Sequence, residues 1–258
     1  MLEGTVWVIR GATVLQCAEG MRLRQGDMLE TMTPAFAQLE FSGGTIAAIG
    51  PASRAFLFRA TGTGGDLVLL SGWLKGETSA KGGPFRYSTP LLGGSTKDGT
   101  FVLHASQSGA EVFVESGSGT IAEVTPQGSL GHTVNVKSGQ FFTRKSGKNV
   151  ATAARADDPF LTSMPPAFRD TLPSRLSRFQ GKKPSTPRAD HEVTYAEIQP
   201  WLTMGQAWRG GFVERFKSRL KDADFRQSIE DHLSNHPEWD QELHPDKYPD
   251  AKQEGDKK

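Results

Sequence analysis

Cysteine is almost absent from this chain of 258 residues, because Cys17 is the single one. One thiol excludes an internal disulfide framework and a zinc site built from several thiolates. Long hydrophobic runs are missing as well. The longest, such as Leu67 to Leu70, are far shorter than the roughly 18 apolar residues that a membrane-spanning helix needs. The sequence therefore predicts no membrane span in this chain.

Charge of one sign is not in excess either, since 30 Lys and Arg residues balance 29 Asp and Glu residues, for a formal net charge of +1. A protein dedicated to DNA or RNA usually carries a strongly basic surface. We therefore predict no nucleic-acid partner. The sequence does contain enough apolar material for a core, with a hydrophobic fraction of 36%, 15 Phe and 5 Trp. This composition predicts a folded chain rather than a disordered one.

Glycine and proline divide the chain into two parts. Of the 29 glycines, 24 lie in residues 1–150, whereas ten of the 15 prolines lie after residue 150. In the first part, short runs of Val, Ile, Phe, Leu and Thr alternate with glycine-containing turns, which is the pattern of many short strands. Alternation is clear in Ala110 to Glu115, where Val112 and Val114 share one face. Residues 4–148 are therefore predicted to be all-β, with less than about 10% helix.

Glycine-rich stretches between these runs are predicted to be turns. Two of them are Ser42 to Gly44 and Ser116 to Gly119, because glycine tolerates the positive φ of tight connections. Gly93 to Lys97 is interpreted in the same way, since it matches no phosphate-binding loop motif. We expect no cofactor at any of them.

The second part of the chain has a helical period. Its apolar residues recur at every fourth position, first at Trp208, Phe212, Phe216 and Leu220 and then at Phe225, Ile229 and Leu233. This pattern predicts two amphipathic helices within a helical module of residues 191–245. Residues 149–190 are predicted to be a linker with a short helix, and residues 246–258 a disordered tail of mixed charge. We expect the module to dock on the β domain, because about 55 residues bury little surface on their own.

Two sequence boxes in the β part resemble the FecR domain. The first runs from Gly20 to Thr31 and reads GMRLRQGDMLET, close to the family pattern G-x-x-L-x-x-G-D-x-L-x-T. The second joins Thr89-Pro90 to Gly99 to Leu103 and then to Ala110 to Gly117. The resemblance covers residues 4–148. It implies stacked short strands, solenoid-like or sandwich-like, in a protein that senses or relays signals in the bacterial envelope.

The sequence departs from the family's pattern in places. Pro34 stands where Ser is common, and Leu91 to Asp98 is longer than usual. The best-known members regulate sigma factors through a cytoplasmic segment and a membrane helix, and this sequence shows neither, so that role is not carried over. We expect a periplasmic location, with Met1 to Glu3 following a removed export signal; a cytoplasmic location is the alternative.

No arrangement of residues typical of an active site stands out in the sequence. The carboxylate of Asp27 is interpreted as stabilising a turn, and Gly117-Ser118-Gly119 lacks the spacing of a nucleophile elbow. His232 and His236 are four residues apart, but Pro237 follows His236 and places it outside the helix. The sequence therefore predicts neither an enzyme nor a metal site.

The favoured hypothesis is a protein-binding, scaffolding or signal-relay module with an envelope protein as its partner. The alternative is a module that binds glycan or peptidoglycan through exposed aromatic residues of the β domain. The candidate partner-binding residues for the two hypotheses are all aromatic: Trp73, Phe85, Tyr87, Trp201, Trp208 and Trp239. Residues 165–188 are basic and residues 227–256 acidic, so the two stretches either face each other, face charged partners or are simply solvated.

Overall fold

The computed structural model describes residues 1–61 and 63–248. Its strands form one open sheet, antiparallel except where β8 and β9 run parallel. The strands are β1 (Leu2–Glu3), β2 (Val6–Arg10), β3 (Thr13–Gln16), β4 (Met28–Thr31), β5 (Phe36–Glu40), β6 (Ile46–Ile49), β7 (Ser53–Ala60), β8 (Gly65–Thr78), β9 (Phe85–Ser88), β10 (Leu92–Ala105), β11 (Gly109–Val124), β12 (Leu130–Lys137), β13 (Phe141–Lys145), β14 (Ala151–Ala153) and β15 (Arg188–Glu192).

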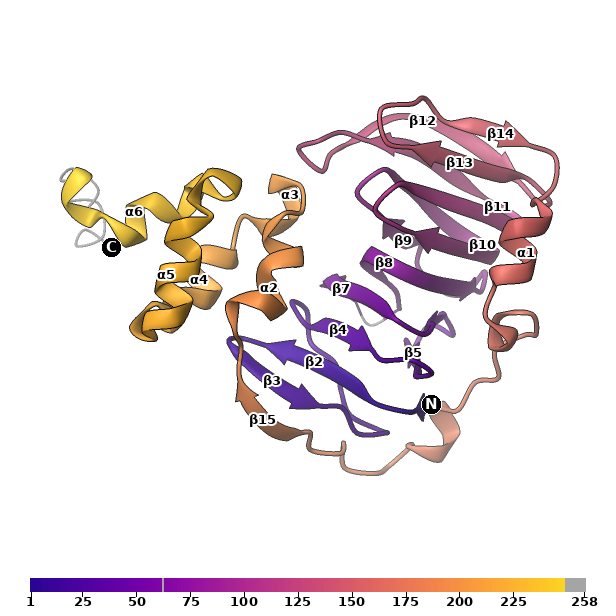
Figure 1. Cartoon of the computed structure of the whole chain (residues 1–258). Coiled ribbons are helices and arrows are strands. Elements are labelled where there is room, and N and C mark those ends of the chain that lie inside the picture. The colour runs from indigo at the N-terminus through magenta and orange to yellow at the C-terminus, as the bar shows by residue number, and fades with distance from the viewer. Residues whose placement is uncertain (62, 249–258) are drawn as a thin grey trace.

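The sheet folds over into two packed layers because three long strands, β8, β10 and β11, belong to both (Figure 1). The first half of β8 pairs with β7, and its second half pairs with β6 and with β10. Where β10 and β11 bend, a Cβ on Gly117 would lie 1.8 Å from the carbonyl oxygen of Asp98. Only glycine fits there, which explains the glycines of this stretch.

The prediction of turns is therefore right in one place and wrong in two. Ser42 to Gly44 does connect two strands, with Gly44 at a φ of 83°. Ser116 to Gly119 instead lies inside β11, and Gly93 to Lys97 lies inside β10. These glycines allow two backbones to approach closely within a bent sheet.

The main core lies between the two layers and follows the predicted alternation. Val112 and Val114 are buried in it, while Glu111 and Phe113 on the other face are only partly covered. In the part of residues 1–148 that the structure describes, the chain forms no helix. The predicted class, mainly β with C-terminal helices, is confirmed, and its architecture is a pair of stacked layers.

The outer face of one layer is covered by the segment that follows β14. It contains α1 (Asp158–Ser163) and the short 3-10 turn η1 (Pro166–Phe168). Phe160 and Phe168 are buried here, and the Phe160 ring centroid lies 5.2 Å from that of Trp73. A second 3-10 turn, η2 (Leu176–Arg178), precedes β15, which pairs with β3. Residues 149–190 thus pack on the sheet along much of their length.

The helical module covers the outer face of the other layer, as expected from its apolar stripes (Figure 1). Phe216 is fully buried, and the Phe212 and Phe56 ring centroids are 5.7 Å apart. The first stripe is not one helix, because Gly210 and Gly211 divide it. The helical elements are α2 (Tyr195–Leu202), α3 (Gln206–Arg209), α4 (Phe212–Phe216), η3 (Lys217–Lys221), α5 (Ala223–Asp231), η4 (Leu233–Asn235), η5 (Pro237–Trp239), α6 (Asp240–Leu243) and η6 (Pro245–Lys247).

Within the described residues, no helix has the length and apolar character needed to cross a membrane. Of the predicted tail, 246–258, the first residues belong to η6, and residues 249–258 lie outside the described residues.

Candidate functional site

The aromatic residues proposed from the sequence as a binding surface are buried. None of the six is more than 8% exposed, and they are Trp73, Phe85, Tyr87, Trp201, Trp208 and Trp239. Phe85 and Tyr87 stack on Phe101 between the layers, at centroid distances of 6.0 and 4.1 Å. A sugar-binding platform needs an exposed ring face, which Trp73, Phe85 and Tyr87 lack. Trp201, Trp208 and Trp239, predicted for a protein partner, present no exposed ring face either. They were mistaken for surface residues because aromatic rings fill cores as readily as they line interfaces.

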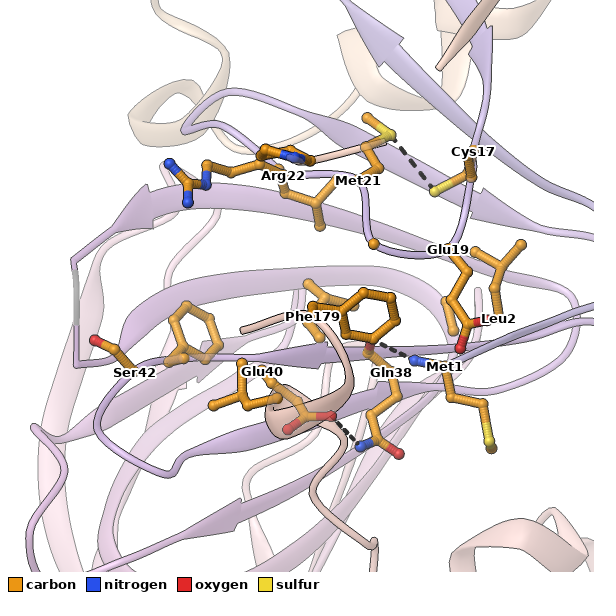
Figure 2. Close-up of a pocket in the computed structure, with 18 of the residues that line it drawn as sticks. Met1, Leu2, Cys17, Glu19, Met21, Arg22, Gln38, Glu40, Ser42 and Phe179 are labelled. Atoms are coloured by element: carbon orange, nitrogen blue, oxygen red, sulfur yellow. Dashed lines mark hydrogen bonds between the residues drawn. The ribbon is translucent and has the colours of Figure 1, made fainter. Parts of the chain in front are cut away.

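A cavity of about 750 Å³ opens at one end of the main core. Its floor comes from β4, β5 and β7, which contribute Leu29, Leu39 and Leu57. Residues 17–23, named here the rim loop, form one wall, and residues 173–185, named the strap, close the opposite side (Figure 2). The rim loop and the strap are at least 150 positions apart in the chain, so the cavity exists only in the folded protein.

The strap is anchored by polar contacts at both ends. At its start, the backbone N–H of Arg175 donates to both carboxylate oxygens of Glu40, at 2.8 and 3.0 Å, and the Ser174 hydroxyl donates to the same carboxylate at 2.7 Å. At its end, the Ser185 hydroxyl donates to the Glu19 carbonyl oxygen at 2.7 Å. Between these points, Phe179 faces the rim loop (Figure 2).

Close contact at Gly20 fixes the distance between strap and rim loop. A Cβ on Gly20 would lie 2.8 Å from the Phe179 ring, and Gly20 has a φ of 82°. A side chain at position 20 would therefore push the strap away and strain the backbone.

The lining of the cavity is mainly apolar with cations at its mouth. Arg22, Lys182 and Lys183 line it and are exposed. Within the described residues, the side chains of these three form no ion pair. The lining carboxylates are already engaged, since Glu40 holds the strap and Glu19 lies 3.8 Å from Arg178.

Cys17 is the single thiol that lines this cavity. Its Sγ lies 3.7 Å from the Met21 Sδ, and burial raises the pKa of the thiol. The thiol is therefore protonated at neutral pH and serves as a polarisable part of the wall.

A second feature is the free edge of β12. This strand pairs with β11 on one side only, and seven of its eight residues are exposed. Leu130 is 48% and Val134 43% exposed. The hairpin before β12 is held against the helical module, because the Ala207 N–H donates to the Gln127 carbonyl oxygen at 2.8 Å.

The remaining sequence candidates have structural roles. The Asp27 carboxylate accepts the Arg24 N–H at 2.8 Å, which confirms its part in a turn, and it also pairs with Arg10 at 2.6 Å. His236 is buried, and the His232 Nδ1 lies 2.9 Å from the Ser228 carbonyl oxygen. Among the described residues, no three metal-ligating side chains gather in one place. The basic and acidic stretches form no ion pair with each other over the part of the chain that the structure covers.

Comparisons with known proteins identify no family. No protein-family model matches the sequence, and no curated protein matches it. Two crystal structures of a protein from Parabacteroides distasonis ATCC 8503, described as a "putative anti-sigma factor", are similar. The first aligns with a TM-score of 0.43 at 11% identity and the second with 0.42 at 12%. In both cases the match covers 52% of this chain and 62% of that chain, less than two thirds of its length. A likeness at this level concerns the fold alone.

Neither the cavity nor the β12 edge was found from the sequence. A partial signal existed for the cavity, because Lys182 and Lys183 belong to the basic stretch noted there. For β12, the run from Leu130 to Lys137 contains no proline and one lysine, which is unusual for an edge strand.

Proposed function

We propose that this chain is a non-enzymatic protein-binding module of the bacterial envelope, and that an extended segment of its partner adds to the free edge of β12. The observation that carries the proposal is the outer edge of β12, which pairs with no strand among the described residues, beside its exposed Leu130 and Val134. An exposed strand edge offers main-chain hydrogen bonds to an added strand, and neighbouring apolar side chains give it specificity. The resemblance to FecR domains supports the envelope location.

The other edges of the sheet are poorly suited to this role. β1 has two residues, β14 has three, and β15 reads Arg-Ala-Asp-His-Glu. Short or highly charged edges are the usual means by which proteins prevent strand addition. β12, with eight residues and one charged side chain at its end, lacks both protections.

The position of β12 also suits signal relay. Its hairpin touches the helical module through Gln127 and Ala207, and the Gly128 backbone packs against Trp208. A strand added to β12 would stiffen the hairpin at the point where the two parts of the chain meet. Binding at the edge is thereby linked to the packing of α3.

The direction of the backbone groups identifies a variant that blocks the edge. The Lys137 N–H donates to the Gln140 side-chain oxygen at 2.8 Å rather than to a β11 carbonyl oxygen. Because N–H groups alternate along an antiparallel strand, the N–H of Asn135 also points away from β11. Asn135→Pro removes this outward donor and leaves the ladder to β11 intact.

Site-specific photo-crosslinking in bacterial envelope extract tests the proposal. A photoreactive residue is placed at Thr133 on the edge of the full-length chain, and at Gln107 on the distant β10–β11 hairpin as the control. We expect a discrete crosslinked protein from position 133 that is lost with Asn135→Pro. Identical products from both positions, products unaffected by Asn135→Pro, or crosslinked copies of this chain alone would contradict the proposal.

A further inference from the structure

The cavity under the strap has the size and lining of a ligand site. Its volume of about 750 Å³ falls in the range of about 300–1,000 Å³ typical of small-molecule pockets. The floor is continuous with the main core, because Leu29, Leu39 and Leu57 belong to both. An apolar body that enters the cavity therefore contacts the apolar side chains of the main core.

The strap spans the cavity without filling it. Its ends are fixed by Glu40 and by the Glu19 carbonyl oxygen, as described above. Leu176, near the start of the strap, lines the cavity and is still 41% exposed. Covering this apolar side chain with an apolar ligand removes it from water, which favours binding.

Three exposed cations, none of which forms an ion pair among the described residues, border the mouth of the cavity. Arg22 stands on the rim loop, and Lys182 and Lys183 on the strap, so cations border the cavity from two sides. The nearby carboxylates of Glu19 and Glu40 already have partners. Uncompensated cations around an apolar cavity favour a ligand with an apolar body and an anionic end.

We propose that this cavity binds a single-chain amphipathic carboxylate, with its aliphatic chain under the strap and its carboxylate held by Arg22, Lys182 and Lys183. This ligand site is separate from the β12 edge and does not depend on the function proposed for it. A bilayer presents the same chemistry, but its acyl chains would have to leave the membrane to pass beneath a strap that is anchored at both ends.

Cys17 allows occupancy to be measured directly on the full-length chain. It is the single cysteine and lines the cavity, so its alkylation by a small maleimide reports access to the interior. Laurate, below its micelle concentration, is the probe. We expect laurate to slow the labelling of Cys17 by about tenfold or more near saturation. Acetate has the carboxylate without the long aliphatic chain, and dodecanol has the chain with a neutral hydroxyl in place of the carboxylate. Both should protect Cys17 far less.

Charge reversal tests whether the lysines at the mouth of the cavity hold the carboxylate. Lys182→Glu combined with Lys183→Glu should weaken laurate protection by about tenfold or more, while Lys145→Glu combined with Lys148→Glu, exposed lysines outside the cavity, should not change it. Equal losses in both double variants, or equal protection by dodecanol, would overturn the proposed recognition. Unchanged labelling with laurate would overturn the site itself. Protection by vesicles of anionic phospholipid but not by free laurate would assign the ligand to a membrane and reject the free carboxylate.

Discussion

The side-chain ammonium of Lys75 lies 2.7 Å from the carbonyl oxygen of Phe168, although 93 residues separate the two. Lys75 also donates to the Asp170 carbonyl oxygen at 3.1 Å and pairs with Glu115 at 3.0 Å. It is buried on the outer face of its layer, where these partners replace water. A strand of the β domain is thus tied to the segment that covers it.

Removing this ammonium should weaken the packing of the segment around Phe168 and Asp170 on the sheet. Lys75→Met keeps the approximate length of the side chain but leaves the Phe168 and Asp170 carbonyl groups and the Glu115 carboxylate without this donor. We expect a loss of about 2–4 kcal/mol in the free energy of unfolding, measured by urea denaturation. The exposed Lys81→Met is the control and should change stability little. Equal losses of unfolding free energy in the two variants would show that Lys75 does not fix this segment to the sheet.

Phe216 tests the docking of the helical module. Its side chain is fully buried in the cluster that joins the helices to the outer face of the sheet. Phe216→Ala should lower the free energy of unfolding by about 3–5 kcal/mol, as truncating a buried Phe does. Lys221→Ala, on the neighbouring 3-10 turn, should be nearly neutral. Limited proteolysis should show faster cleavage of Phe216→Ala between residues 181 and 190; an unchanged cleavage rate would argue against docking through this face.

Val112 and Glu111 test the register of β11. Val112 is completely buried between the layers, so Val112→Asp places an unpaired charge there and should abolish stable folding or cost several kcal/mol. Glu111 lies on the other face, 2.9 Å from His104, and is partly exposed. Glu111→Ala should lower stability by less than about 1 kcal/mol. Comparable shifts in melting temperature would mean that the register is wrong.

His191 should make the chain less stable as the pH rises. Hydrogen bonds to the carboxylates of Asp190, first, and Glu197 raise the pKa of His191. The folded state therefore holds a proton that the unfolded state releases near pH 6.5, so the stabilisation is complete below about pH 6.5 and is lost as the pH passes the raised pKa. In His191→Gln this loss of stability with rising pH should be absent, as measured by the midpoints of urea denaturation at a series of pH values from below to above the raised pKa. A decline of the same size in the variant would assign it to other groups.

His236 should have the opposite effect. Burial lowers the pKa of His236, so below about pH 6.5 the unfolded state takes up a proton that the folded state does not. Stability should fall with falling pH until the lowered pKa is reached. His236→Phe keeps an aromatic ring at the position and should flatten this acid limb, which hydrogen exchange in α5 can follow at mildly acidic pH. An acid limb that persists in the variant would contradict the assignment.

The sequence by itself determined which residues of β11 and of the helical stripes turn inward. In β11 the alternation places Val112 and Val114 inside, and in the helical module the spacing of Phe212 and Phe216 predicts their burial. These features are local, because each follows from the two-residue period of a strand or the 3.6-residue period of a helix. The class of the fold and the position of its helices follow from the same periods.

Only the tertiary structure decided where the chain bends and what remains open. Gly117 resembles a turn residue in sequence, and its true role depends on Asp98 of the adjacent strand. The cavity brings Cys17, Leu39 and Lys182 together from three distant segments, and the β12 edge is free because no later strand pairs with it in the described chain. Such features depend on contacts between residues far apart in the sequence, and local patterns carry no information about which segments meet or which surfaces stay uncovered.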